Sequence, residues 1–349
     1  MDGSVTQPKP GSLDLRPPDH ALWKLNKTEP PVTGTRAEPP RRSAPVAQRV
    51  AHWLERRLVP LVVGAAALGV AFPTGGRYLT GVHGIPVTLA VLVATTGIAL
   101  TTGQLRASRT ATARLLGVLV ITSVALPALA WGASQLTDPG PMRQGVLAAG
   151  VAPAEVASVA LVGLGGGEAA LTAALLIGST LVTVLAAGPI LSILGSAATV
   201  GSTALLIQLL LVVALPLAAG ITTRHALRPN ETVLSAAAGL GTLALLTLLW
   251  QVASQITLKP SYVSLTLAVL VFLVASTGLG CLLTIRLTPA RRLALTLPVA
   301  MRDFAVAAGI ATAAFGPAAA APLGIYGLLV LLAGALAARL AHTTRSSGS

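Results

Sequence analysis

Residues Leu293–Phe315 read LALTLPVAMRDFAVAAGIATAAF, an apolar run that is interrupted by Pro298, Arg302 and Asp303. A run of this length can cross the ~30 Å hydrocarbon core of a bilayer as one helix. Proline removes a helix donor and disturbs the preceding turn, and charge inside a membrane is tolerated where it is paired or faces a cavity. We therefore expect a broken transmembrane helix here.

A second apolar run, Val146–Leu164, is interrupted in the same way by Pro153 and Glu155. Broken helices at corresponding positions of two halves of a transporter mark its binding site. The alternative is that Arg302 and Asp303 form an ion pair that only braces the bundle. In either case a buried arginine needs a partner, and Glu155 and Asp303 are the carboxylates predicted to lie within the spans.

The whole chain has the composition of a membrane protein. Its 349 residues are 54% hydrophobic and 10% charged, and the mean hydropathy is +0.79. Soluble domains carry about 25% charged residues. The uninterrupted apolar runs differ from the short alternating strands of a barrel. We expect an all-α protein with about ten spans, at residues 58–72, 85–102, 115–134, 144–164, 169–194, 204–221, 232–252, 262–285, 293–315 and 318–340.

The net charge of +13 would suggest nucleic-acid binding in a soluble protein, but the charges lie on one side of the predicted membrane. Counting loops alternately puts 20 of the 24 Lys and Arg on the side of the N-terminus, three on the other side, and Arg302 inside a span. The positive-inside rule then predicts that both termini are cytoplasmic. We expect a multi-pass protein of the cell membrane that binds no nucleic acid.

Three parts of the chain differ in composition. Residues 1–57 are rich in proline and charge and lack an apolar segment, which predicts a disordered basic cytoplasmic tail. We expect Val50–Arg57 to be a topology anchor; alternatively, it lies on the membrane as an interfacial helix. Residues 58–340 are the predicted transporter domain, and residues 341–349 form a short cytoplasmic tail.

The predicted spans fall into two sets of five. Each span of the second set starts 146 to 149 residues after its counterpart in the first. Because five is odd, the second set must enter the membrane from the opposite side. Inverted repeats of this kind are common in secondary transporters, although evenly spaced spans can give similar offsets by chance.

Several stretches resemble the bile acid:sodium symporter family. The likeness covers most of residues 58–340 and rests on the order and spacing of the motifs. In the first half they are TTGIALTTGQL from Thr95, LPALAW from Leu126, PAEVAS from Pro153 and GEAALT from Gly167. In the second half they are VAMRDFAVA from Val299 and FGPAAAAPL from Phe315.

The resemblance implies ten spans in two inverted repeats, crossed fourth and ninth helices, and a core domain that slides against a panel domain. It also implies transport of a small organic anion, usually with two sodium ions bound at the crossing. Ser158 keeps a family serine, and Thr172 replaces another hydroxyl ligand. The other family ligands are replaced by Thr122, Val159, Leu176, Pro298 and Arg302.

The lost carboxylate at Pro298 and the added charge of Arg302 make sodium coupling doubtful, since sodium, like calcium, is a hard cation that needs oxygen ligands. Proton-linked or uncoupled transport remains open, with sodium or a proton as the coupling ion and no other cofactor. The predicted substrate and ion site comprises Thr122, Pro153, Glu155, Ser158, Thr172, Met301, Arg302 and Asp303.

We find no catalytic motif and therefore expect no enzyme. A related arsenite permease is a further option, but the cysteine that carries its chemistry is missing from the broken fourth span. The main alternative to a transporter is a receptor or channel built on a transporter fold. We expect the partners to be the lipid bilayer and a small organic anion.

Overall fold

The structure is a computed structural model that describes residues 49, 53–54, 57–101, 112–194, 201–257 and 260–346. The predicted basic tail, with its anchor or interfacial helix at Val50–Arg57, lies almost wholly outside these residues. The described elements belong to one compact unit, Ala44–Ser349. The last helix continues to Ser346, so most of the predicted C-terminal tail is helical.

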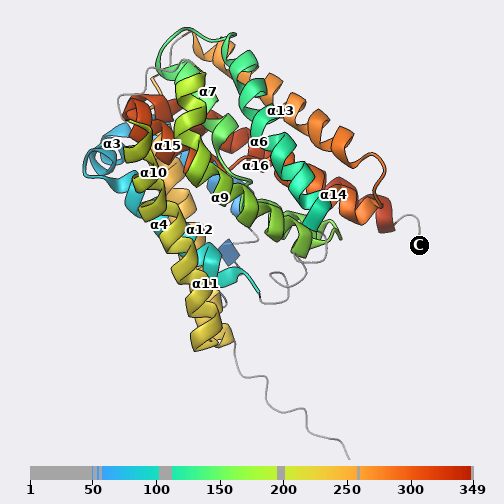
Figure 1. Cartoon of the computed structure of the whole chain (residues 1–349). Helices are drawn as coiled ribbons and strands as arrows, with labels where there is room; N and C mark the ends of the chain where they lie inside the picture. Colours follow the sequence, from blue (N-terminus) through green and yellow to red (C-terminus); the bar gives the residue numbers. More distant parts are fainter. Residues whose placement is uncertain are drawn as a thin grey trace, which may run out of the picture. The chain divides into compact units, whose positions relative to one another are not determined.

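The described residues form helices and no strand (Figure 1). In chain order the elements are α2 (Leu58–Ala71), α3 (Pro73–Gly81), α4 (Gly84–Ala99), α6 (Thr112–Ser134), α7 (Pro141–Val151), α8 (Ala157–Leu164), α9 (Ala169–Ile193), α10 (Ser202–Leu209), η2 (Leu210–Ala214), α11 (Leu215–Leu227), α12 (Glu231–Ala253), α13 (Tyr262–Thr284), α14 (Pro289–Ala300), α15 (Phe304–Phe315), η3 (Pro317–Ala320) and α16 (Ala321–Ser346).

Six helical stretches among the described residues are long and apolar enough to span a membrane, or seven if the bent pair α3–α4 counts as one span. They are α6, α9, α10 through α11, α12, α13, and η3 with α16. Large apolar side chains such as Val124, Ile193 and Val263 are exposed on these helices. Such apolar surface suits contact with lipid tails. The protein is therefore a multi-pass membrane protein.

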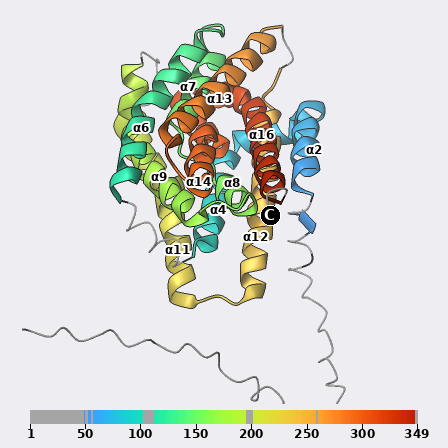
Figure 2. The same cartoon turned by 90° about the vertical axis from the view of Figure 1, so that its right-hand side faces the viewer.

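One group of helices packs around α4. This helix contacts both α11 and α12, and α2 packs against α12 (Figure 2). Gly97 of α4 and Gly220 of α11 let the two backbones approach closely, since a β-carbon on Gly97 would lie 2.5 Å from the Leu217 carbonyl oxygen. Close packing through small residues is typical of helices in membranes.

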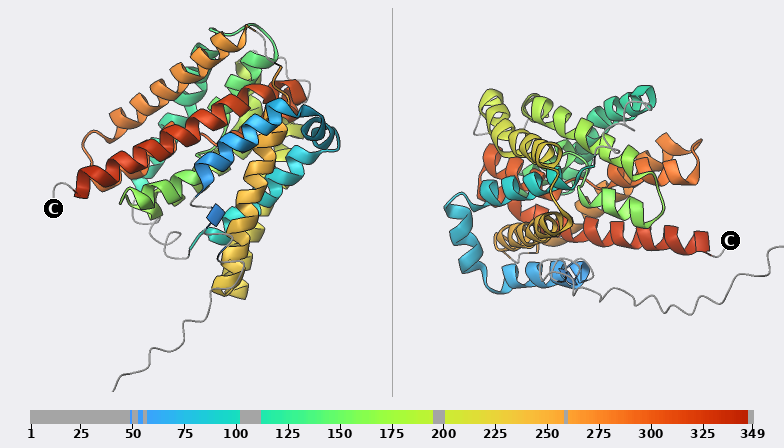
Figure 3. Two further views of the ribbon diagram at one scale, coloured as in Figure 1. Left: turned by 180° about the vertical axis from the view of Figure 1, so that it is seen from behind. Right: turned by 90° about the horizontal axis from the view of Figure 1, so that it is seen from below.

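A second group contains the broken helices. α7 packs against α6, α14 packs against α13, and α9 and α16 contact both pairs of half-helices (Figures 1 and 3). Both predicted helix breaks are present: α7 ends at Val151 before α8 begins at Ala157, and α14 ends at Ala300 before α15 begins at Phe304.

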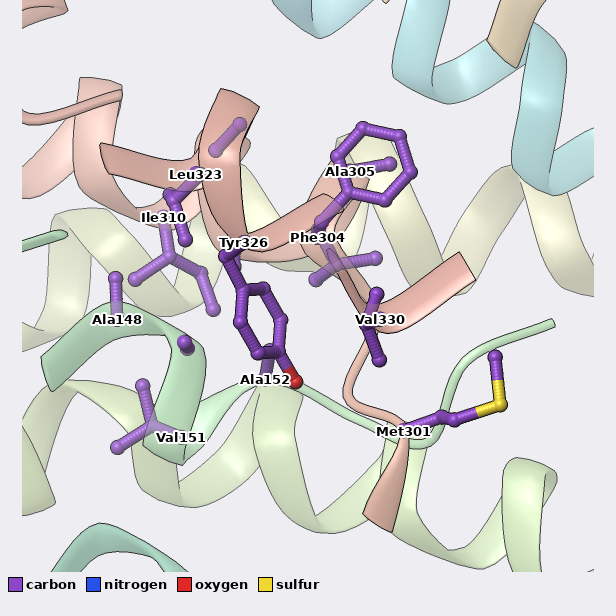
Figure 4. Close-up of a cluster of buried hydrophobic side chains, with 14 of the residues drawn as sticks. Ala148, Val151, Ala152, Met301, Phe304, Ala305, Ile310, Leu323, Tyr326 and Val330 are labelled. Atoms are coloured by element: carbon purple, nitrogen blue, oxygen red, sulfur yellow. The ribbon is translucent and has the colours of Figure 1, made fainter. Parts of the chain in front are cut away.

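The buried aromatic residues of this group lie beside the second break. Tyr326 of α16 packs beside Phe272 of α13 with tilted rings, whose centroids are 6.0 Å apart. Figure 4 shows the Tyr326 hydroxyl directed toward the segments that join the half-helices, while the Met301 side chain is directed away from Tyr326. The apolar core thus supports the two breaks directly.

Candidate functional site

The extended segments that interrupt the two broken helices pair with each other, and we call this pairing the crossing. The Glu155 N–H donates to the Met301 carbonyl at 2.9 Å, and the Asp303 N–H donates to the Pro153 carbonyl at 2.8 Å. These bonds form an isolated antiparallel bridge between Ala154 and Arg302. The crossing is therefore held by the main chain of both segments.

Side chains from neighbouring helices bond the backbone groups that the breaks leave free. Thr183 donates to the Val151 carbonyl at 2.9 Å, and Ser179 accepts from the Ala154 N–H at 3.0 Å. The Arg302 N–H donates to the Tyr326 hydroxyl at 3.0 Å. Irregular backbone at membrane depth is tolerated only when it is bonded in this way or lines water.

Pro298 lies within α14, three residues before the break at Met301. Because proline has no N–H, the carbonyl of Ala294, four residues earlier, cannot receive its usual helical bond. The Thr172 hydroxyl of α9 donates to that carbonyl at 2.8 Å. Thr172, which the family resemblance assigns to ion binding, therefore has a structural partner in α14.

The Glu155 carboxylate lies at the N-termini of two half-helices. Its Oε1 accepts from the Ala157 N–H of α8 at 3.5 Å, and its Oε2 accepts from the Phe304 N–H of α15 at 3.4 Å. Glu155 is 1% exposed. Helix N-termini carry partial positive charge and favour anions. Glu155 thus places a carboxyl group where two helix dipoles favour an anion.

Asp303 is the N-cap of α15. Its Oδ1 accepts from the N–H groups of Ala305 and Val306, both at 2.9 Å. A capping aspartate satisfies donors that a helix start leaves free. At 2% exposure, the Asp303 carboxylate is enclosed in the protein.

The Arg302 guanidinium makes a different contact from the one that the sequence predicts. The expected ion pair with Glu155 or Asp303 is wrong: among the described residues, the ion pair within 4.0 Å is that between Arg291 and Glu168. Arg302 donates instead to the carbonyl of Ala152, which ends α7. A cation at the C-terminus of a helix interacts favourably with the helix dipole.

Arg302 reaches into a cavity of about 20 Å³ that Thr122, Ser123, Ser179 and Thr183 also line. This is room for about one water molecule. The four hydroxyls donate to backbone carbonyls, so they offer oxygen lone pairs to the cavity. The Arg302 Nε–H has no hydrogen-bond partner among the described residues. A water that accepts from Nε and donates to a hydroxyl oxygen would suit this cavity.

A larger cavity, of about 420 Å³, lies on the Glu155 side of the crossing. We call it the Glu155 cavity. Residues of α4, α8, α9 and α12 line it, and Glu155 is its ionisable wall residue. Thr95, Thr96 and Thr242 are also in the wall, but their hydroxyls donate to carbonyls of their own helices. The cavity wall is therefore mostly apolar, with one carboxyl group and three hydroxyl oxygens that can still accept hydrogen bonds.

The predicted site residues lie around one crossing but do not converge on one pocket. Pro153, Ser158, Met301 and Asp303 belong to the crossing or its flanking turns, and the Ser158 hydroxyl donates to the Glu155 carbonyl at 2.6 Å. Thr122 and Arg302 face the small cavity, Glu155 faces the large one, and Thr172 binds α14. The described residues contain no group of three or more His, Cys, Asp or Glu that could hold a metal ion.

Sequence reasoning missed Ser179, Thr183 and Tyr326, which bond the crossing from α9 and α16. The first two are spaced four residues apart in an apolar helix, and that spacing places both hydroxyls on one helix face. This spacing could have indicated a polar contact of α9 with the break. No sequence signal of comparable strength marks Tyr326.

Comparison with known proteins identifies the family of the chain. A search of curated proteins finds no match. Residues 86–264, about half of the chain, match the Sodium Bile acid symporter family. The matched region contains the first broken helix with Glu155 and the walls of the Glu155 cavity from α4, α8, α9 and α12. The match covers enough of the chain to assign it: the protein belongs to the Sodium Bile acid symporter family, whose members are membrane transporters.

Proposed function

We propose that this protein is a secondary active transporter that moves a small organic anion by alternating access, with Glu155 at the substrate site. The observation that carries the proposal is the convergence of the Ala157 and Phe304 N–H groups on the Glu155 carboxylate beside a cavity of about 420 Å³. Ligand pockets of ~300–1,000 Å³ accommodate small molecules.

Glu155 supplies a route to proton coupling. As a carboxylate it occupies the positive ends of α8 and α15 and excludes a second anion by repulsion. Once protonated, its carboxyl group carries no charge and can donate a hydrogen bond. A substrate carboxylate can then bind at the same helix ends, so proton and anion enter together.

Arg302 supports indifference to sodium. Its guanidinium supplies positive charge at the C-terminus of α7, and half-helix C-termini are places where transporters bind their coupling cations. A fixed cation there leaves no need for a dissolved one. The small cavity beside Arg302 has room for about one water molecule, so we place the substrate at Glu155 and not at the guanidinium.

We further propose ten spans in two inverted repeats, in the cell membrane and with both termini cytoplasmic. The half-helices support the repeat: α7 and α14 begin 148 residues apart, and α8 and α15 begin 147 residues apart. The contacts of α6 with α7 and of α13 with α14 also correspond. In this arrangement the broken pairs α7–α8 and α14–α15 each count as one span and cross near the bilayer centre.

Uptake and counterflow in proteoliposomes test the transport proposal. Purified full-length protein is reconstituted into proteoliposomes. Uptake of candidate carboxylates, and their counterflow into preloaded vesicles, is assayed with and without a sodium gradient and with an inward proton gradient. We expect accumulation that rises with the proton gradient and does not change with sodium. Strict dependence on a sodium gradient, with lithium and choline ineffective, would contradict the coupling. Binding without accumulation would instead favour a receptor.

A further inference from the structure

A second cavity lies next to the Glu155 cavity. It has a volume of about 480 Å³ and is lined by α2, α8, α12 and α16. The Thr242 hydroxyl is bonded to the Ala238 carbonyl of its own helix at 3.1 Å. The other walls are apolar or glycine, and they include Val62, Leu161, Leu164, Leu331, Leu332 and Ala335. We call it the apolar side cavity.

The two cavities share part of their walls. Ala157, Ala160 and Thr242 line both, so the cavities lie on either side of these small side chains. On one side of these shared residues lie the Glu155 carboxyl and the N–H groups of two half-helices, and on the other side the described wall residues include no charged group. A ligand that fits both sides has an anionic head and an apolar tail.

We propose that the apolar side cavity is a subsite for the apolar tail of the transported anion, whose head binds at Glu155. The inference rests on the proposed function and adds a substrate class to it: carboxylates with a medium-length hydrocarbon chain. The shared wall residues Ala157, Ala160 and Thr242 place this cavity directly beside the Glu155 cavity, which favours a substrate tail over a bilayer lipid as the occupant. Burial of each further methylene group strengthens binding by roughly fourfold.

Chain-length dependence of binding tests the subsite. The full-length protein, in nanodiscs of phosphatidylcholine and phosphatidylglycerol at acid pH, is titrated with radiolabelled butyrate and octanoate, and binding to empty nanodiscs is subtracted. We expect octanoate to bind at least tenfold more tightly than butyrate. Equal affinities would overturn the subsite. Binding of butyrate alone would also overturn the subsite but would leave the head site in place. Binding of neither acid would overturn the head site and the subsite together.

Filling the apolar side cavity should remove the preference for the longer acid. Ala335→Phe puts an aromatic ring into a cavity wall formed by α16, and Leu336→Phe is its control because Leu336 is 59% exposed and lines neither cavity. We expect Ala335→Phe to weaken octanoate binding at least tenfold and to change butyrate binding less than twofold. Unchanged octanoate binding would assign the cavity to lipid and overturn the proposal.

A second variant covers the case in which Ala335→Phe loses both ligands through misfolding. Gly163 lines the cavity from α8, and a β-carbon added there would meet only Ala169 Cβ, at 4.0 Å. Gly163→Leu therefore adds a bulky side chain at the cavity wall without a backbone clash. We expect the same selective loss of octanoate affinity. Loss of both acids to the same degree in this variant too would overturn the subsite.

Discussion

Glu155 and Arg302 neutralise opposite helix ends at one crossing. The Glu155 carboxylate accepts from the first N–H groups of α8 and α15, and the Arg302 guanidinium donates to the carbonyl of Ala152, the C-cap of α7. Helix dipoles make the first place favourable for an anion and the second favourable for a cation. Each position where a transporter could hold a dissolved ion is thus partly occupied by a side chain of the protein itself.

Replacing Glu155 by glutamine should separate exchange from coupling. The neutral amide cannot release a proton, so we expect Glu155→Gln to lose uptake driven by a proton gradient while it keeps substrate counterflow that no longer varies with pH. Both are measured in proteoliposomes. Glu168→Gln is the control, because Glu168 is exposed, pairs with Arg291 and does not line the Glu155 cavity. Coupled uptake that survives in Glu155→Gln would assign the proton to another group near the crossing, such as Asp303.

Replacing Arg302 by lysine should change stability more than transport. Lysine keeps the charge but lacks the planar fork that reaches the Ala152 carbonyl. A buried carbonyl that loses its donor costs about 1–3 kcal/mol. We expect a lower thermal midpoint, unchanged substrate affinity and continued indifference to sodium. Arg339→Lys, on an exposed part of α16, is the matched control. A large loss of substrate affinity with unchanged stability would instead place the guanidinium in contact with substrate.

At the scale of the elements, α9 supplies a hydrogen bond that α14 cannot form by itself. Pro298 leaves the Ala294 carbonyl without its helical donor, and Thr172 supplies the missing hydrogen bond. The two helices therefore depend on each other at a position where neither has a charged residue. This predicts an energetic coupling between Thr172 and Pro298, although the two side chains cannot form a hydrogen bond with each other.

A double-mutant cycle measures this coupling. Thr172→Val should lower the free energy of unfolding by about 1–2 kcal/mol, since it leaves the Ala294 carbonyl unbonded. In a Pro298→Ala background the N–H of residue 298 can bond that carbonyl, so the same change should cost less than half as much. Unfolding is followed by circular dichroism in mixed micelles. Equal costs in both backgrounds would show that the Thr172 bond does not depend on the proline.

The helix breaks could be predicted from the sequence, but the hydrogen-bond partner of Arg302 could not. Prolines and charges inside apolar runs marked both breaks, because an intact membrane helix tolerates neither well. The directions of the side chains depend on the crossing itself: successive residues of an extended segment point to opposite sides. The bridge between Ala154 and Arg302 therefore turns Arg302 away from Glu155 and Asp303. No local sequence pattern indicates that two segments 148 residues apart will pair.

For the molecule as a whole, the charge distribution gives the topology to be tested. We expect reporter fusions after Ser346 and near Pro229 in the α11–α12 turn to report the cytoplasm, and a fusion near Pro139 between α6 and α7 to report the other side. Alkaline phosphatase and a fluorescent protein give complementary readouts. Opposite sides for Ser346 and Pro229 would show that the number of spans between them is odd and that the ten-span arrangement is wrong.

Glu155 is tethered beside the place that we propose for the substrate head, and tethering has a consequence for affinity. A group held by a short linker competes at an effective concentration in the millimolar range. A dissolved anion must overcome this competitor whenever Glu155 is charged. If only a fraction of the molecules has Glu155 protonated, the apparent dissociation constant is the intrinsic one divided by that fraction. The acid face of the membrane would then load substrate tightly and the alkaline face would release it, so acidity would set the direction of net flux.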